Sequence, residues 1–205
     1  MSTELLKQVS DRYISAVNFH RNMRDIFILF SLNGFAYQHL YQYISESDAQ
    51  FKLKEFITRT YSCFITDGQP QDFDLIANNI KNKKRIELSN DEISKCIPEL
   101  WTQYRQWEFE TLNLYESIAS QLSKSRDVIG YNFVKDLAVE VSEELNNIND
   151  TITQYNYINW DEPVIFDRQD TIAERYTFKI RELYKKFPKF HHMNSMVNIG
   201  DIKKD

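Results

Sequence analysis

Residues 100–123 read LWTQYRQWEFETLNLYESIASQLS, and this stretch decides the fold class. Its apolar residues recur at steps of three and four, which is the spacing of one face of an α-helix. Ser89-Asn90-Asp91-Glu92 just before it has the pattern of a helix N-cap. Pro98 is the one objection, and the long helix could instead begin there. The pattern predicts a helix over 91–123 with the apolar positions Ile93, Ile97, Leu100, Trp101, Tyr104, Leu112, Tyr115, Ile118, Ala119 and Leu122.

The segments after this helix repeat its pattern. Ser125-Arg126-Asp127 predicts a turn, and the next apolar stripe predicts a helix over 128–155. The stretch from Asn159 to Pro163 ends this region, and a last helix is predicted over 170–187.

The segments before it are also helical in pattern. One long helix is predicted over 3–43, with a kink or break expected at Asn33-Gly34. The run from Ser45 to Asp48 has the pattern of a stop and a new N-cap, so a second helix should begin there and end near Asp67-Gly68-Gln69-Pro70. A short helix is also predicted over 72–83.

Composition supports long helices. The chain has 205 residues but only 4 Gly and 4 Pro, so few breaks are expected. Short loops between long elements favour an all-α antiparallel four-helix bundle with an additional C-terminal helix. We expect a single domain over 1–190 and a loosely ordered tail over 191–205.

Charge and hydropathy exclude some partners. A net charge of −5 argues against non-specific nucleic-acid binding, which needs a dense basic surface. No apolar stretch approaches the roughly 20 residues that span a bilayer, and the N-terminus lacks a signal pattern, so we expect a cytoplasmic protein without membrane contact. Cys63 and Cys96 show neither pairing nor metal spacing and are expected to be free thiols.

Three carboxylates fall on the apolar faces of the predicted helices. Glu108 lies one turn from Tyr104 and Leu112, and Glu140 and Glu144 share a face of the next helix. Burying a charge is costly unless it is paired or bound to metal. The sequence therefore predicts either a metal site at Glu108, Glu140 and Glu144, or buried ion pairs and hydrogen bonds with cations such as Arg21, Arg24, Lys54, Arg59 and Lys135.

Two histidines also lie on apolar stripes. One helix over 3–43 would separate His20 from His39 by about 28 Å, so they could share a site only if the chain bends sharply. A core histidine with a local hydrogen bond is the expected role of each. His191-His192 is expected to face solvent.

The segment over 107–152, WEFETLNLYESIASQLSKSRDVIGYNFVKDLAVEVSEELNNINDTI, resembles the third and fourth helices of ferritins without a gap. The resemblance places Glu108 on the ferroxidase glutamate of the third helix. It places Glu140, Glu143 and Glu144 on acidic positions of the fourth, and Val141 where ferritins often carry a glutamine ligand. It implies a diverged member of the ferritin-like superfamily.

The first half of the chain matches in two registers that disagree. In one register, Glu46-Ser47-Asp48-Ala49 stands for the Glu-x-x-His ligand pair, and in the other it is Glu55-Phe56-Ile57-Thr58. Neither has the histidine, and no glutamate suits the first helix, so the di-iron ligand set is incomplete.

Three functions follow, and the sequence leaves open whether the chain is an enzyme. The first is a non-catalytic binding or assembly scaffold, with a homo-oligomer as one form and any protein partner unknown. The alternative is a carboxylate-rich Fe or Mn binding protein or oxidase with an atypical site. A helical RNase of the phage-defence or toxin type ranks last, because His20-Arg21 and His39 lack the expected order and spacing.

Overall fold

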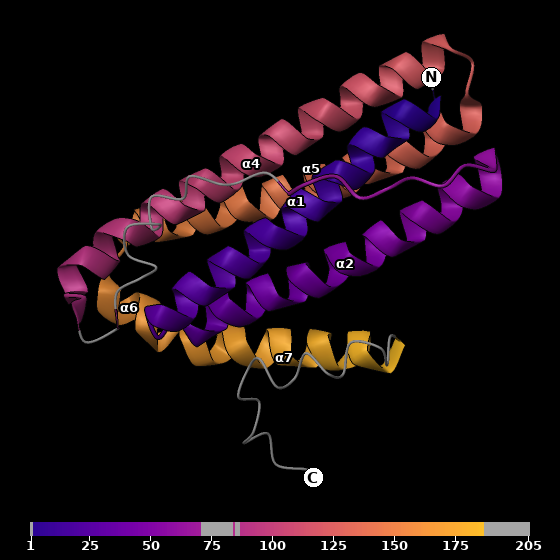
Figure 1. Cartoon of the computed structure of the whole chain (residues 1–205). Helices are drawn as coiled ribbons and strands as arrows, with labels where there is room; N and C mark the ends of the chain where they lie inside the picture. The colour runs from indigo at the N-terminus through magenta and orange to yellow at the C-terminus, as the bar shows by residue number, and fades with distance from the viewer. Residues whose placement is uncertain (1, 71–83, 85–86, 187–205) are drawn as a thin grey trace.

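Four long helices form two antiparallel hairpins in the computed structural model, which describes residues 2–70, 84 and 87–186 (Figure 1). The first hairpin is α1 (Ser2–Leu29) with α2 (Asn33–Tyr61), and the second is α4 (Asn90–Lys124) with α5 (Val128–Tyr157). A short α6 (Glu162–Asp167) and a longer α7 (Gln169–Lys186) follow. The predicted four-helix bundle with an extra C-terminal helix is confirmed. The short helix expected over 72–83 and the tail over 191–205 lie outside the described residues.

The predicted single helix over 3–43 is wrong, because the chain reverses at Phe30-Ser31-Leu32. Ser31 has a positive φ of 62°, and the Leu32 amide donates back to the Phe27 carbonyl at 2.9 Å. This closes α1 with a left-handed residue, which is a common way to end a helix. The sequence placed the break slightly too late, at Asn33-Gly34, which instead begin α2.

The helix start predicted at Ser45–Asp48 is also wrong, because these residues lie inside α2. The Ser47 hydroxyl donates to the Tyr43 carbonyl at 2.7 Å, and Asp48 pairs with Lys52 one turn later at 2.7 Å. Ser and Asp side chains commonly cap helices, but here they make their hydrogen bond and ion pair inside a helix.

The second hairpin follows the prediction closely. Ser89 and Glu92 form the expected capping box at the start of α4, and the Asp127 side chain accepts from the Gly130 amide at the start of α5. The helix continues through Pro98, so the suggested start at that residue is wrong. One missing backbone donor there is tolerated within a well-packed helix.

The two hairpins are joined by a long connection, residues 62–89, and not by a short loop. Figure 1 shows α2 and α4 running in the same direction. None of the described helices has an apolar window long enough to cross a membrane. Among the described residues, neither Cys63 nor Cys96 forms a disulfide bond.

The hydrophobic core is divided along the bundle axis. One cluster gathers aromatic residues near the α1–α2 turn, including Phe19, Phe27, Phe35, Trp101 and Tyr155. The second lies nearer the N-terminus and holds mainly aliphatic residues, including Leu6, Val9, Leu53, Ile118 and Leu122. The residues between them on α2, α4 and α5 include glutamates, so a polar layer separates the two clusters.

Helix α7 lies along the outside of α2 (Figure 1). Leu40 and Ile44 of α2 pack against Ile180 and Tyr184 of α7. The buried Gln169 side chain accepts from the Phe35 amide at 3.1 Å, so α7 supplies the cap that Leu32 lacks at the start of α2. The fifth helix is therefore part of the packed structure.

Candidate functional site

An internal cavity of about 270 Å³ lies in the polar layer between the two core clusters. All four bundle helices line it: α1 with Tyr13 and Ala16, and the others with the glutamates that face it. These glutamates are Glu46 on α2, Glu108 on α4, and Glu140 and Glu144 on α5. The structure thus brings together the three predicted carboxylates and adds a fourth.

Glu108 is the most buried of the four, with 4% of its surface exposed. Burial raises its pKa well above the usual range, and the nearby charges of Glu144 and Glu46 raise it further. The positive charge of Arg12 opposes this effect. Glu108 therefore favours its neutral form as long as no cation enters the cavity.

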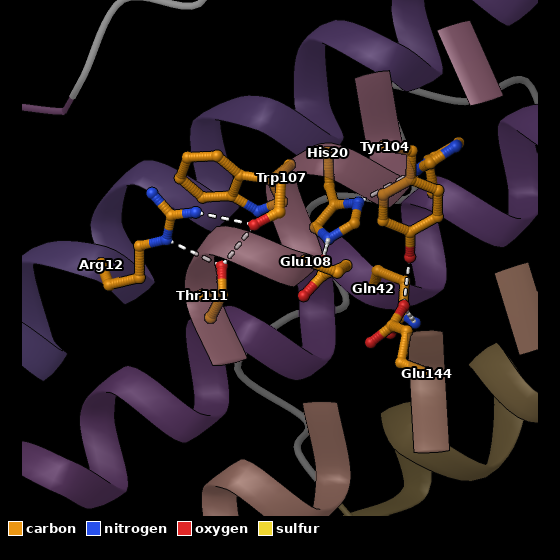
Figure 2. A network of polar contacts seen from close by, with 9 residues as sticks. Arg12, His20, Gln42, Tyr104, Trp107, Glu108, Thr111 and Glu144 are labelled. Atoms are coloured by element: carbon orange, nitrogen blue, oxygen red, sulfur yellow. Dashed lines mark hydrogen bonds and ion pairs between the residues drawn. The ribbon is translucent and has the colours of Figure 1, made fainter. Parts of the chain in front are cut away.

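Arg12 is the cation that sequence reasoning did not single out. Its Nε donates to Thr111 Oγ1 and a terminal nitrogen donates to the Trp107 carbonyl, both at 2.8 Å. The guanidinium also lies over the Trp107 ring, 3.1 Å from its centroid. Figure 2 shows the Arg12 guanidinium against Trp107 and Thr111 of α4, the residues on either side of Glu108. These contacts fix the position of Arg12, and its positive charge lowers the pKa of Glu108.

The five cations expected to pair with the inward carboxylates go elsewhere, so that part of the structural alternative is wrong. Arg21 donates to Asn18, Arg24 to Asp25, and Lys54 and Arg59 pair with Asp67 and Glu55. Lys135 lies near the Tyr131 ring.

Glu144 is satisfied by neutral donors. The Tyr104 hydroxyl and the Gln42 amide both donate to its Oε1 (Figure 2). Burial raises the pKa of Glu144, and these two hydrogen bonds work in the opposite direction. The structural alternative is therefore partly realised, with Tyr and Gln in place of Arg and Lys.

Glu46 was not among the predicted site residues. Burial raises its pKa to about 8, with further contributions from Glu144 and Glu140. The sequence signal was hidden because the neighbouring serines and Asp48 have the pattern of a helix cap. Glu46 and Ala49 both line the cavity, whereas Glu55 is exposed and pairs with Arg59. Of the two registers, the one through Glu46 is the one that reaches the site.

Glu140 lies at the edge of the cavity and is exposed. Its pKa is raised by partial burial and by Asp136 and Glu143, while Lys52 lowers it. Val141, the residue that stands in place of a ligand in the resemblance, lines the cavity too.

His20 and His39 share a site, because the turn after α1 brings their helices side by side. Their Nδ1 atoms lie 3.0 Å apart, so one ring donates to the other. Burial lowers the pKa of His20 to about 3 and that of His39 well below its usual value, so both rings are neutral. Both are buried, hydrogen-bonded histidines, but the expectation of a local hydrogen bond is wrong, because the bond joins α1 and α2.

The histidine pair also reaches toward the carboxylates. His20 Nε2 lies 4.0 Å from Glu108 Oε1, which is too long for a hydrogen bond (Figure 2). Neither Nε2 atom has a hydrogen-bond partner among the described residues. His20 Nε2 is thus a buried nitrogen of a neutral ring, without a hydrogen-bond partner among the described residues, and it lies next to Glu108.

A bound metal ion needs several ligand atoms close to one point. Within residues 2–70, 84 and 87–186, no three His, Cys, Asp or Glu side chains stand close enough together to hold an ion. The donor types suit a hard divalent cation, but the side chains do not already converge on one point.

No protein-family model matches the chain, and no curated protein matches it in sequence. Several solved structures match its fold. A humanized archaeal ferritin superposes with a TM-score of 0.68, covering 84% of this chain and 94% of its own at 15% identity. The fold is ferritin-like. An open-pore ferritin from Archaeoglobus fulgidus gives a TM-score of 0.65 at 15% identity, with 84% and 95% covered, and an engineered closed form of that ferritin gives the same score.

The ferritin-like resemblance predicted from residues 107–152 is confirmed at the level of fold. At 15% identity the likeness covers the bundle and carries no information about the reaction. The function of this ferritin-like bundle therefore depends on its cavity and on the side chains that line it.

Proposed function

We propose that this ferritin-like bundle binds a divalent metal ion between Glu46, Glu108 and Glu144, with Glu140 at the edge of the same cavity. The observation that carries the proposal is the meeting of carboxyl groups from three helices at one internal cavity. Burial and the charges of neighbouring carboxylates raise the pKa of Glu46 and of Glu108, and a cation in the cavity would relieve both effects. Carboxylate ligands suit iron or manganese.

The proposed site fits a metal in donor type and burial but not in present spacing. To hold an ion, the carboxylates have to turn into the cavity, and Glu144 has to exchange hydrogen bonds with Tyr104 and Gln42 for the ion. Glu46 and Glu108 also have to lose their protons. Metal binding would therefore compete with protons and become tighter as pH rises.

A second candidate is a binding or assembly scaffold without metal chemistry. It is favoured by the donors that already satisfy Glu144, and by Ala49 and Val141, which line the cavity but offer no ligand atom. In that case the polar layer consists of neutral carboxyl groups joined by hydrogen bonds.

Metal content separates the two candidates. Iron, manganese and zinc are measured per chain in the purified protein, after incubation with Fe²⁺ or Mn²⁺ and removal of free ions. The metal-binding proposal expects about one or two ions per chain. Glu108→Gln and Glu144→Gln should each lose most of the bound metal, because each removes a charged ligand of similar size.

Glu116→Gln is the matched control, since Glu116 is an exposed glutamate on α4. It should keep the wild-type metal content. A wild-type protein that takes up no metal, together with folded variants, would overturn the proposal in favour of the scaffold. Molecular mass in solution, measured on the same samples, tests whether the chain forms a homo-oligomer.

A further inference from the structure

A second, larger space adjoins the central cavity. It is a cleft of about 700 Å³ between α2, α5 and α7, within the size range of small-molecule sites. Tyr41, Gln42, Glu140 and Glu144 line both spaces, so the cleft and the cavity meet at these residues. No pattern in the sequence indicates this cleft, because it depends on how α7 packs in the fold.

The α7 wall of the cleft is basic. Arg168, just before α7, and Arg175 and Lys179 within it all line the space. Arg175 and Lys179 are four residues apart and so share a helix face. Lys179 Nζ lies near two rings, 5.2 Å from the centroid of Tyr41 and 5.0 Å from that of Tyr176. These tyrosines hold the ammonium group in place without neutralising it.

The α5 wall opposite is acidic, with Glu140, Glu143, Glu144 and Asp150. In the part of the chain that the structure describes, no ion pair of 4.0 Å or less joins the two walls. The described acidic residues of α5 and basic residues of α7 therefore line the same cleft without forming ion pairs across it. A ligand carrying only negative charge would be repelled by α5, and one carrying only positive charge would be repelled by α7.

We propose that this cleft binds a small zwitterion, an α-amino acid or a short peptide. Its carboxylate lies between Arg175 and Lys179, and its ammonium group lies on the side of Glu140 and Glu143. Tyr41, Tyr176 and Phe35 supply aromatic surface for the remainder of the molecule. The guanidinium and carboxylate ends give the two charge-assisted contacts that fix its orientation.

Isothermal titration of the full chain tests the proposal, with EDTA present so that the result does not depend on the metal site. The probes are the common L-amino acids and dialanine, each up to about 10 mM, which detects millimolar affinity. At least one should bind saturably. For that ligand, the amine lacking the carboxylate and the acid lacking the amino group should each bind at least tenfold more weakly.

The double variant Arg175→Gln with Lys179→Gln should also lose tenfold or more in affinity. Arg181→Gln is its control, because Arg181 lies on α7 but lines a different groove. The proposal is overturned if no probe binds, if either singly charged analogue binds as well as its parent, or if the double variant binds normally. Should circular dichroism show that the double variant is unfolded, the analogue comparison with the wild type decides alone.

Discussion

At the scale of single residues, Glu46 is expected to make the stability of the fold depend on pH. Its pKa is about 8 in the folded chain and near 4.5 when unfolded. Between these values the folded state binds more protons than the unfolded state, so the free energy of unfolding falls as pH rises. Each such group contributes a slope of at most about 1.4 kcal/mol per pH unit.

Glu46→Gln should therefore flatten the fall of stability between pH 5 and pH 8. Urea unfolding at several pH values measures this, with Glu116→Gln as the control that keeps the wild-type slope. A Glu46→Gln protein whose stability falls as steeply as that of the wild type would show that Glu46 is ionised in the folded state.

Tyr104 stabilises Glu144, another carboxyl group of the polar layer. Its hydroxyl donates to Glu144, so Tyr104→Phe leaves a buried carboxyl group with one donor fewer. The expected cost is about 1–3 kcal/mol of unfolding free energy. Denaturant titration measures it, and Tyr157→Phe, at a fully exposed tyrosine, should change nothing. Equal stability of Tyr104→Phe and wild type would mean that this hydrogen bond is unimportant.

Single site residues were predictable from the sequence only where they interrupt an apolar stripe. Glu108 and Glu144 do so, and both face the cavity. Glu46 does not, because its neighbours Ser45 and Ser47 are polar. Arg12 was also missed, because its contacts with Trp107 and Thr111 join residues that are far apart in the chain.

At the scale of elements, α2 and α7 approach each other closely. A Cβ atom at Gly34 would lie 2.6 Å from the Gln169 carbonyl oxygen and 2.8 Å from the Ile172 Cβ. Both contacts are with the start of α7, so Gly34 is needed for the two helices to approach, and not for a turn.

Gly34→Ala should displace the start of α7 and cost about 1–3 kcal/mol through overpacking. Hydrogen–deuterium exchange locates the effect: amides of α7 should exchange faster, while those of α4 and α5 serve as the internal control. Unchanged protection of α7 would contradict the tight packing described here.

The sequence predicted α4 and α5 well and the first hairpin poorly, for a physical reason. In the second hairpin, cap residues stand at the true ends and the apolar stripes are regular. In the first, the turn is made by Ser31 in a left-handed conformation, which no local pattern marks. Ser47 and Asp48 resemble a cap but bond within α2, so local preference yields to packing.

At the scale of the whole molecule, the bundle is two apolar clusters with an acidic layer between them. Such a layer costs stability, and a fold selected for stability alone would have filled it with apolar side chains. The carboxyl groups that three helices bring to one cavity are the observation behind the proposed metal binding. Periodicity indicates the carboxylates of α4 and α5, but it could not reveal the whole layer, because the layer forms only when three helices pack in the correct register.

Mn²⁺ titration of the metal-free protein at pH 6.5 and pH 8.5, followed by the electron paramagnetic resonance signal of free Mn²⁺, tests the proposed metal binding most directly. We expect saturable binding at pH 8.5. Binding should be at least about tenfold weaker at pH 6.5, because Glu46 and Glu108 are then protonated. The double variant Glu46→Gln with Glu108→Gln should lose binding. No saturable binding at either pH, or undiminished binding in that double variant, would contradict the proposal.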